Sequence, residues 1–231
     1  MSAQDQGKAP GLAPGLALIF DMDGVIVDSN PVHRLAWEAF NRRYGLETTE
    51  AMHRRMYGKH NADIVRDYFG ADLPEAEVTA RGAAKEQLYR ELAGARVESM
   101  LVPGIRNFLE EYGGAPMGLA SNAEAENVDF ILQRSGLRRF FRVVVSGRDV
   151  IRPKPAPEVF LRVAELLAVP PENSIVFEDS PTGVQAALAA GMRTVGIRTT
   201  YENLPGTSIS VNNLMSRTLR RWLAIQAAFG R

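Results

Sequence analysis

The sequence of 231 residues contains no cysteine and no long apolar segment. Without cysteine, disulfide bonds, thiol catalysis and thiolate metal sites are excluded. No apolar run approaches the roughly 18 residues of a membrane-spanning helix, and residues 1–15 lack the charged-then-apolar order of a signal peptide. We therefore expect a cytoplasmic protein with no membrane partner, whose residues 1–15 form a flexible tail rich in glycine, alanine and proline.

The chain also lacks net charge, because 27 Lys and Arg residues balance 27 Asp and Glu residues. A neutral chain offers no overall field that would attract nucleic acid or acidic lipid, so no nucleic-acid partner is expected. The length suits one large or two small domains with enough apolar material for a core. We expect a monomer or a weak homo-oligomer.

Two aspartates follow a short apolar run near the start of the chain. Residues 16–20 are five consecutive apolar residues, a pattern typical of a strand buried on both faces of a parallel sheet. Asp21 and Asp23 come directly after this run. Because ligands of open α/β sheets bind beyond the carboxyl ends of such strands, we interpret both carboxylates as functional groups.

The next segment, residues 30–99, has helical apolar spacing and no strand pattern. Asn30 and Asn61 are expected to cap two of its helices. From residue 103 onward, helices alternate with short apolar runs, and the expected strands lie at 117–120, 141–145, 174–177 and, last, 194–197.

That alternation predicts βαβ units and an α/β fold with a doubly wound parallel sheet. We therefore expect an α/β core made of residues 16–29 and 100–231. The helical domain of residues 30–99 is inserted after the first strand, where a lid over the strand ends would arise.

Three further segments place polar groups after predicted strands. Ser121 and Asn122 open a helix, where a hydroxyl and free backbone N–H groups suit a phosphate oxygen, and an ordinary helix cap is the alternative. Lys154 lies among three prolines that fix a rigid turn, and a solvated loop lysine is the alternative. Glu178 and Asp179 are adjacent acids at the end of a buried strand. A helix cap needs only one acid, so capping does not account for both.

These groups would bring four carboxylates into one crevice, with Lys154 as the nearby cation; the carboxylates are those of Asp21, Asp23, Glu178 and Asp179. Like-charge repulsion would raise their pKa values or push the loops apart. A divalent cation resolves this conflict, and an all-oxygen donor set favours Mg²⁺ over zinc.

Other sites for a cation or a nucleotide do not fit the sequence. In a calcium-binding EF-hand loop starting at Asp21, position 5 would be Val25, position 6 would be Ile26 instead of glycine, and position 12 would be Val32 instead of glutamate. The chain also has no Gly-rich Walker loop and no GxGxxG motif.

The ordered set Asp21-Met22-Asp23-Gly24, Ser121, Lys154 and Glu178-Asp179 resembles the four motifs of the haloacid dehalogenase-like hydrolase superfamily. The segments PKPAPEVF and FEDSPTGVQAA are similar to the third and fourth motifs, and the match covers nearly the whole chain. The helical insertion after the first motif resembles the C1-type cap of β-phosphoglucomutase and of small-metabolite phosphatases.

The resemblance implies a role for each acid. Asp21 would be the nucleophile that attacks phosphorus and forms an aspartyl-phosphate. Asp23 would first protonate the leaving oxygen and then activate the water that hydrolyses the intermediate. The Asp21 carboxylate, the Asp23 carbonyl and Asp179 would hold Mg²⁺, with Glu178 acting mainly through a bound water.

The resemblance likewise implies which groups hold the phosphate. Ser121, Lys154 and backbone N–H groups near Met22, Asp23 and Asn122 would bind the phosphoryl oxygens, since an anionic phosphate attacked by a carboxylate requires positive charge. The dehalogenase and phosphonate-cleaving branches lack an acid two residues after the nucleophile. An acid at position 23 therefore favours cleavage of a P–O bond.

We predict a Mg²⁺-dependent phosphatase of small phosphorylated metabolites, with sugar phosphates as the leading candidates. β-Phosphoglucomutase is the alternative within the enzymes, and a catalytically silent domain that binds phosphorylated ligands is the alternative from another class. In the mutase the cap loop carries an arginine three residues after a glycine. Here Gly58 is followed at that distance by Asn61, and this difference favours the phosphatase.

The inserted helical segment supplies four candidate substrate residues, namely His33, Gly58, Lys59 and Lys85. His33 and Lys85 occupy positions similar to those of mutase residues, and Lys59 belongs to a basic stretch that could attract an anionic substrate. The alternatives are a partly exposed helix residue for His33, a solvated charge for Lys85 and a solvated helix end for Lys59.

Overall fold

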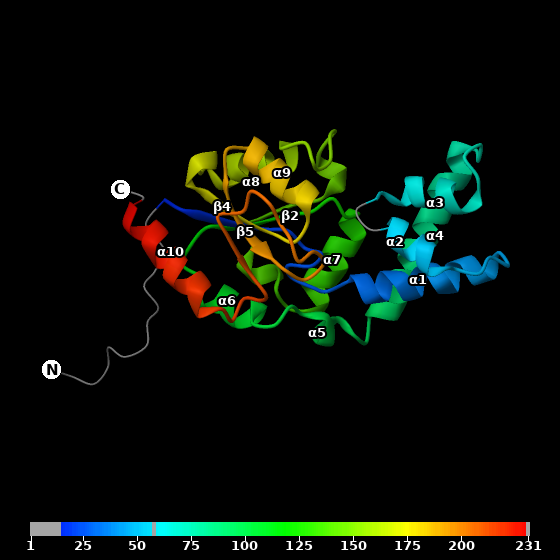
Figure 1. Cartoon of the computed structure of the whole chain (residues 1–231), viewed down its shortest axis with the longest axis horizontal. Coiled ribbons are helices and arrows are strands. Elements are labelled where there is room, and N and C mark those ends of the chain that lie inside the picture. Colours follow the sequence, from blue (N-terminus) through cyan, green and yellow to red (C-terminus); the bar gives the residue numbers. More distant parts are fainter. Residues whose placement is uncertain (1–14, 57–58, 230–231) are drawn as a thin grey trace. The chain divides into compact units, whose positions relative to one another are not determined.

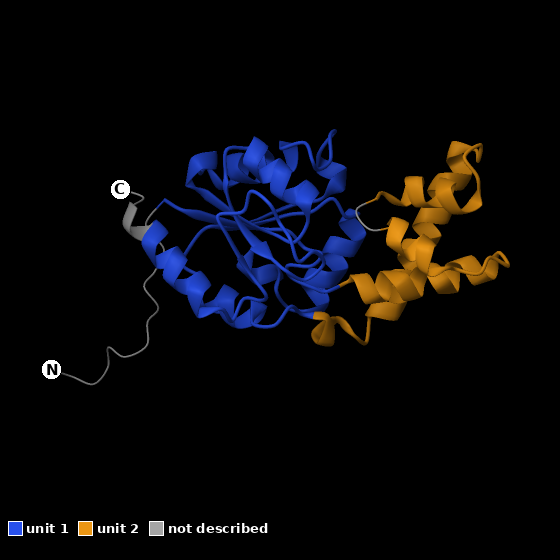
Figure 2. Ribbon diagram, in the orientation of Figure 1, with its two compact units in different colours: residues 1–28, 101–231 blue, residues 29–100 orange. Residues whose placement is uncertain are grey.

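The computed structural model describes residues 15–56 and 59–229 (Figure 1). The chain divides into two compact units (Figure 2): one contains the described residues up to Asp28 and from Leu101 onward, and the other spans Ser29–Met100. Ser29 and Met100 therefore belong to the helical unit, one residue beyond each end of the predicted range 30–99.

The first unit is built on a parallel sheet. Its described residues form six strands in the order β3-β2-β1-β4-β5-β6, and every neighbouring pair is parallel. The strands are β1 (Ala17–Phe20), β2 (Met117–Ala120), β3 (Val143–Val145), β4 (Ser174–Glu178), β5 (Arg193–Ile197) and β6 (Ile209–Val211). The predicted doubly wound parallel sheet is confirmed, with β1 at its centre.

Helices cover both faces of this sheet (Figure 1). One face carries α8 (Glu158–Leu167) and α9 (Pro181–Ala189), and the other carries α6 (Ile105–Glu111), α7 (Ala125–Arg134) and α10 (Arg217–Phe229). Short 3₁₀ helices span Arg138–Phe140, Gly147–Asp149 and Pro171–Asn173.

The alternation of side chains along the strands divides the core between these two layers. Ile19 and Val176 pack with the apolar side chains of α8 and α9. On the opposite face, the rings of Phe20 and Phe177 stack at 4.6 Å between centroids, and both meet Phe108 of α6 edge-on. The apolar run of β1 is therefore buried on both faces, as its sequence predicts.

The second unit consists of α1 (Asn30–Arg43), α2 (Glu50–Met56), α3 (Asn61–Phe69), α4 (Glu75–Ala93) and α5 (Val97–Met100). Trp37 and Phe40 of α1 pack against Ile64 and Val65 of α3, with Val78 of α4 in the same apolar cluster. None of the helices in the described part of the chain combines the length and apolarity required to cross a bilayer.

Several predicted boundaries are wrong. The strand expected at 141–145 begins at Val143, and the strand at 194–197 is not the last, because β6 and α10 follow it. Three residues of β6 are too few to carry a periodic signal. Asn30 and Asn61 are the first helical residues and not the caps, since Ser29 and His60 occupy the cap positions.

We predict that Leu18→Ala lowers the free energy of unfolding by about 2–5 kcal/mol, because a buried leucine loses both its burial and its packing. Leu18 lies in β1 and is 0% exposed. Urea denaturation followed by circular dichroism measures the change.

The matched control is Leu166→Ala on α8, whose side chain is 49% exposed. It should change the free energy of unfolding by no more than about 0.5 kcal/mol. Equal effects of the two substitutions would contradict the assignment of β1 to the centre of the core.

Candidate active site

The chain leaves β1 at Asp21 and enters a tight turn. The Asp21 amide still donates to the Phe177 carbonyl of β4 at 3.0 Å, so β4 fixes the backbone at this position. The amides of Ile26 and Val27 donate to the Met22 carbonyl at 2.8 and 3.1 Å. The turn is therefore closed on itself, which holds residues 21–23 at the carboxyl end of the sheet.

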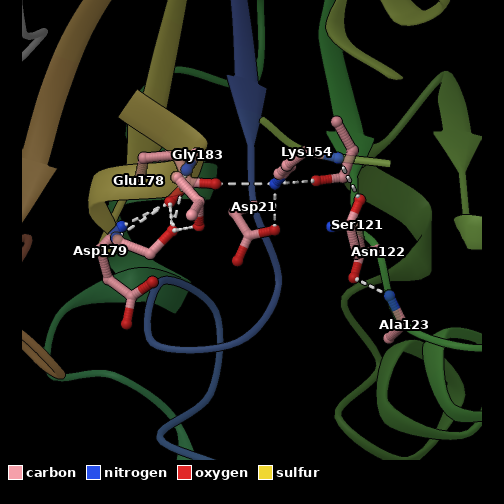
Figure 3. Close-up of polar contacts among 11 residues, drawn as sticks. Asp21, Ser121, Asn122, Ala123, Lys154, Glu178, Asp179 and Gly183 are labelled. Carbon is pink, nitrogen blue, oxygen red and sulfur yellow. Dashed lines mark hydrogen bonds and ion pairs between the residues drawn. The ribbon is translucent and has the colours of Figure 1, made fainter. Parts of the chain in front are cut away.

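Parallel register brings the ends of three strands together at this point. Phe20 lies beside Leu119 of β2 and Phe177 of β4, so the residues that follow these strands are neighbours at one edge of the sheet. Asp21, Ser121 and Glu178 are all buried there. Figure 3 shows the Asp21 and Glu178 carboxylates both bonded to one lysine ammonium.

That ammonium belongs to Lys154, which is 9% exposed. Its Nζ donates to Asp21 Oδ1 at 2.6 Å, to Glu178 Oε1 at 2.7 Å and to the Ala120 carbonyl at 3.0 Å. It also lies 4.6 Å from the centre of the Phe160 ring, a cation–π distance. All three ammonium protons have acceptors, and the alternative of a solvated loop lysine is wrong.

Both carboxylate oxygens of Glu178 are held. Oε1 accepts from Lys154, and Oε2 accepts from the Asp179 amide, the Ser180 amide and the Ser180 hydroxyl, each at 3.0 Å. The carboxylate lies against the first turn of α9, where a Cβ on Gly183 would come within 1.8 Å of Oε1. Only glycine at position 183 leaves room for this side chain.

Asp179 packs in a similar way against the turn after β1. Gly24 has a positive φ of 76°, and a Cβ there would lie 1.8 Å from Asp179 Oδ2. One carboxylate oxygen each from Asp21, Glu178 and Asp179 all lie within 4.8 Å of one another. Asp21 and Asp179, which lie far apart in the sequence, therefore share one buried site, as the sequence predicts.

The electrostatics of this site are unbalanced. Burial raises the pKa of the Asp21 carboxyl to about 7; Lys154 opposes this shift, and Glu178 and Asp23 add to it. Burial also raises the pKa of Asp179 well above its usual value, together with the charges of Glu178 and Asp21. For Lys154, burial acts to lower the pKa, but Asp21 and Glu178 raise it above its usual value.

These observations fit a divalent cation. Among the described residues, Asp21, Glu178 and Asp179 form a group able to hold a metal ion, and all their donor atoms are oxygens. Three carboxylates against the single ammonium of Lys154 leave an excess of negative charge at a buried position. Such a donor set suits hard cations that prefer oxygen ligands.

Ser121 and Asn122 fix the neighbouring loop. The Ser121 hydroxyl accepts from the Ala123 amide at 3.0 Å, and Asn122 Oδ1 accepts from the Lys154 amide at 3.1 Å. The residue at the cap of α7 is Glu124, so the alternative in which Ser121 caps that helix is wrong. Asn122 instead joins the loop after β2 to the loop that carries Lys154 (Figure 3).

Met22 and Asp23 lie in the turn after Asp21. The Met22 side chain is buried, and its carbonyl closes the turn. Asp23 is partly exposed, and its backbone pairs with Val27. The Asp23 charge contributes to the raised pKa of Asp21, so the two carboxyl groups interact.

The helical unit brings two of its predicted site residues together. His33 Nδ1 of α1 lies 3.0 Å from Lys85 Nζ of α4, and Lys85 is 2% exposed, so its assignment to a solvated face is wrong. Glu86 and Asn61 complete this group, which we call the α4 cluster (His33, Asn61, Lys85 and Glu86). Lys59 is exposed, and Gly58 lies outside the described residues.

Two residues near these sites, Gly183 and Thr200, escape sequence reasoning. Gly183 lies in α9, and nothing in the sequence around it indicates that the Glu178 carboxylate packs against it. Thr200, in the segment after β5, bonds to Asp179 through its side chain and thereby lowers the pKa of that carboxyl. The position of Thr200 after a strand was a usable signal, because polar residues at strand ends identified the other members of the site.

Known proteins with similar sequences support the same assignment. A family model described as haloacid dehalogenase-like hydrolase matches residues 16–191. Fructose-1-phosphate phosphatase YqaB of Escherichia coli K12 is 34% identical over 182 residues, which cover 78% of this chain and 95% of that protein. β-Phosphoglucomutase of Mycobacterium bovis is 33% identical over 210 residues, covering 78% of this chain and 79% of the mutase.

Solved structures agree with these sequence matches. A crystal structure of β-phosphoglucomutase from Clostridium difficile superposes with a TM-score of 0.79 at 25% identity, covering 92% of this chain and 98% of that one. The family predicted from the four sequence motifs is confirmed by the match over residues 16–191. The chain belongs to the haloacid dehalogenase-like hydrolase family.

Proposed function

We propose that this protein is a Mg²⁺-dependent phosphatase that hydrolyses small phosphorylated metabolites, with sugar phosphates as the substrate class. The observation that carries the proposal is the buried convergence of the Asp21, Glu178 and Asp179 carboxylates, the first two of which bond to the Lys154 ammonium. Relatives described as phosphatases of fructose 1-phosphate and of phosphorylated carbohydrates support the substrate class. A cytoplasmic location stays a prediction from the sequence.

In the proposed reaction an Asp21 carboxylate oxygen attacks phosphorus, and the bond from phosphorus to the sugar oxygen breaks. Asp23 gives its proton to the departing oxygen, so that the sugar leaves as an alcohol. Asp23 then removes a proton from water, which attacks the aspartyl-phosphate, releases inorganic phosphate and regenerates Asp21. The position of Asp23 two residues from the nucleophile, in the turn closed by Met22, supports this division of roles.

The acidic group would hold the metal. Asp21, Asp179 and the Asp23 carbonyl are the proposed ligands, and Glu178, whose two oxygens already accept four hydrogen bonds, would act through water. Mg²⁺ in this place would supply positive charge to the phosphoryl oxygens and to the attacking carboxylate.

Neighbouring groups would bind the phosphate itself. Lys154 supplies a fixed cation, and its amide is held by Asn122 at 3.1 Å. The Ser121 hydroxyl, together with backbone N–H groups near Met22 and Asn122, is proposed to donate to the phosphoryl oxygens. Because these donors are fixed before substrate arrives, they need little reorganisation during the reaction.

We further propose that the helical unit acts as the cap that selects the substrate. Its insertion directly after the turn that carries Asp21 and Asp23 supports this role. His33 and Lys85 of the α4 cluster, with Lys59 and Gly58, are the proposed substrate residues of this unit. Selectivity in this arrangement belongs to a segment separate from the one that performs the chemistry.

β-Phosphoglucomutase activity is the second candidate, because relatives of both kinds share similar identity with this chain. A mutase must hold a second phosphate, and the position at which it carries arginine is occupied here by Asn61. Interconversion of glucose 1-phosphate and glucose 6-phosphate, primed by the bisphosphate, would identify a mutase. A catalytically silent domain would bind the sugar phosphates without turnover.

The purified protein should release phosphate from members of a sugar-phosphate panel with Mg²⁺ and lose this activity with EDTA. Asp21→Asn should abolish turnover while leaving the circular dichroism spectrum and melting temperature close to those of the wild type, since the substitution is isosteric. A colorimetric phosphate assay measures both effects. Near-wild-type turnover in Asp21→Asn would rule out the nucleophile.

Lys154→Met should lower kcat by at least about 100-fold, because one preorganised electrostatic contact to a developing charge is typically worth 10²–10³-fold. The carboxylates remain, so the variant should still bind Mn²⁺ in an electron paramagnetic resonance titration. Arg152→Met, two positions away with a side chain that is 75% exposed, is the control and should retain activity. Equal rates for the two variants would contradict the role of Lys154.

Gly183→Ala should reduce kcat strongly, because the new methyl group overlaps the Glu178 carboxylate. Alanine in a helix is otherwise more favourable than glycine by about 1 kcal/mol, so the loss cannot come from helix propensity. Gly114→Ala is the matched control, since no atom lies within 4 Å of a Cβ at that position. Full activity of Gly183→Ala would show that Glu178 has no fixed position in the reaction.

A further inference from the structure

The Asp179 carboxylate is supported from outside the group of acids to which it belongs. Asp21 and Glu178 both accept hydrogen bonds from the Lys154 ammonium, at 2.6 and 2.7 Å. Asp179 accepts a hydrogen bond from the side chain of Thr200, which lies in the segment after β5. The third carboxylate is therefore held by an uncharged donor that comes from a different strand.

The backbone that leads to Thr200 is fixed by two hydrogen bonds. The Arg198 amide donates to the Val211 carbonyl of β6 at 2.8 Å. The Thr199 amide donates to the Ile197 carbonyl at 2.9 Å, which closes a three-residue turn at the end of β5. Because β5 pairs with β4, a turn at this place brings the Thr200 side chain to the acid that follows β4.

Asp179 needs such a contact, because its surroundings repel it. Its side chain belongs to a residue that is 5% exposed, and one of its oxygens lies within 4.8 Å of carboxylate oxygens of Asp21 and Glu178. Like charges at this range favour a carboxylate that turns away from its neighbours. Gly24 limits that movement on one side, since a Cβ there would lie 1.8 Å from Asp179 Oδ2. The directional hydrogen bond from Thr200 opposes rotation of the carboxylate itself.

We propose that Thr200 is a positioning residue for the metal ion, whose hydroxyl holds the Asp179 carboxylate in the arrangement that binds the cation. The inference rests on the proposed Mg²⁺-dependent function. A hydroxyl donates one hydrogen bond, whereas an ionised carboxylate has about four acceptor positions, so most of them stay available to a cation. Threonine also orients the carboxylate without neutralising it, and the negative charge that attracts the cation is kept.

A purely structural role for this hydrogen bond makes a different prediction. A contact that only ties the segment after β5 to the sheet would lower the melting temperature when it is lost. It would leave the affinity of the folded protein for a cation unchanged. A positioning role lowers that affinity even in a variant that keeps its melting temperature. Cation affinity, measured apart from turnover, is therefore the decisive quantity.

The test measures Mn²⁺ binding by electron paramagnetic resonance, without substrate, for the wild type and for Thr200→Val. Valine keeps the branched shape of threonine and lacks the hydroxyl. The dissociation constant for Mn²⁺ should rise about 10–100-fold, which is the usual effect of removing a hydrogen bond to a metal-binding side chain. The Mg²⁺ concentration that gives half-maximal phosphate release should rise by a similar factor.

Thr199→Val is the matched control, because it makes the same change one position earlier. Thr199 is partly exposed, as Thr200 is, and among the contacts described it bonds through its backbone amide. This variant should bind Mn²⁺ with wild-type affinity. Thr200→Ser keeps the hydroxyl and should also bind normally, whereas Thr200→Ala lacks it and should bind as weakly as Thr200→Val. Melting temperatures of all four variants separate a folding defect from a change in affinity.

Wild-type Mn²⁺ affinity in folded Thr200→Val overturns the inference, as does an equal loss of affinity in Thr199→Val. Should Thr200→Val fail to fold, the comparison of Thr200→Ser with Thr200→Ala decides: equal affinities overturn the inference, and a loss confined to Thr200→Ala supports it. Absence of Mn²⁺ binding by the wild type is a distinct result, because it refutes the metal dependence of the proposed function and, with it, the role of Thr200.

Discussion

The contact on which the site depends is the buried Lys154 ammonium shared by Asp21, Glu178 and the Ala120 carbonyl. Its three acceptors follow or end three different strands, β1, β4 and β2. Leaving the charge of Lys154, Asp21 or Glu178 buried and unpaired would cost several kcal/mol. The Lys154 charge is therefore compensated only when β1, β2 and β4 lie side by side in the observed order. The contact that depends on this order also defines the site.

The compensation of charge at this site is incomplete, because one ammonium cannot neutralise three carboxylates. The excess charge is held in place by close backbone approach at Gly24 and Gly183, where a methyl group would overlap Asp179 or Glu178. Hydrogen bonds that close the turn after β1 and that hold Glu178 against the start of α9 oppose separation of the carboxylates. The energy of that repulsion is what makes the site suited to a divalent cation.

The sequence predicts the family, the parallel sheet and the members of the acidic site, because polar residues at the ends of apolar runs must meet at one edge of such a sheet. It does not predict which oxygen of Glu178 faces Lys154, nor that Gly183 permits the approach. The buried state of Lys85 also escapes it, since the partner His33 lies 52 positions away and α4 has no clear apolar face. Local periodicity reports which residues share a helix face, not which distant charges pair.

The site around Lys154 and the α4 cluster, both buried among the described residues, differ in their balance of charge. The site around Asp21 has excess negative charge and is suited to a cation and the phosphate that it attracts, whereas the α4 cluster is neutral and rich in hydrogen-bond partners. The α/β unit therefore needs an added cation to complete its charge balance at Asp21, Glu178 and Asp179, whereas in the helical unit the Lys85–Glu86 pair already completes it.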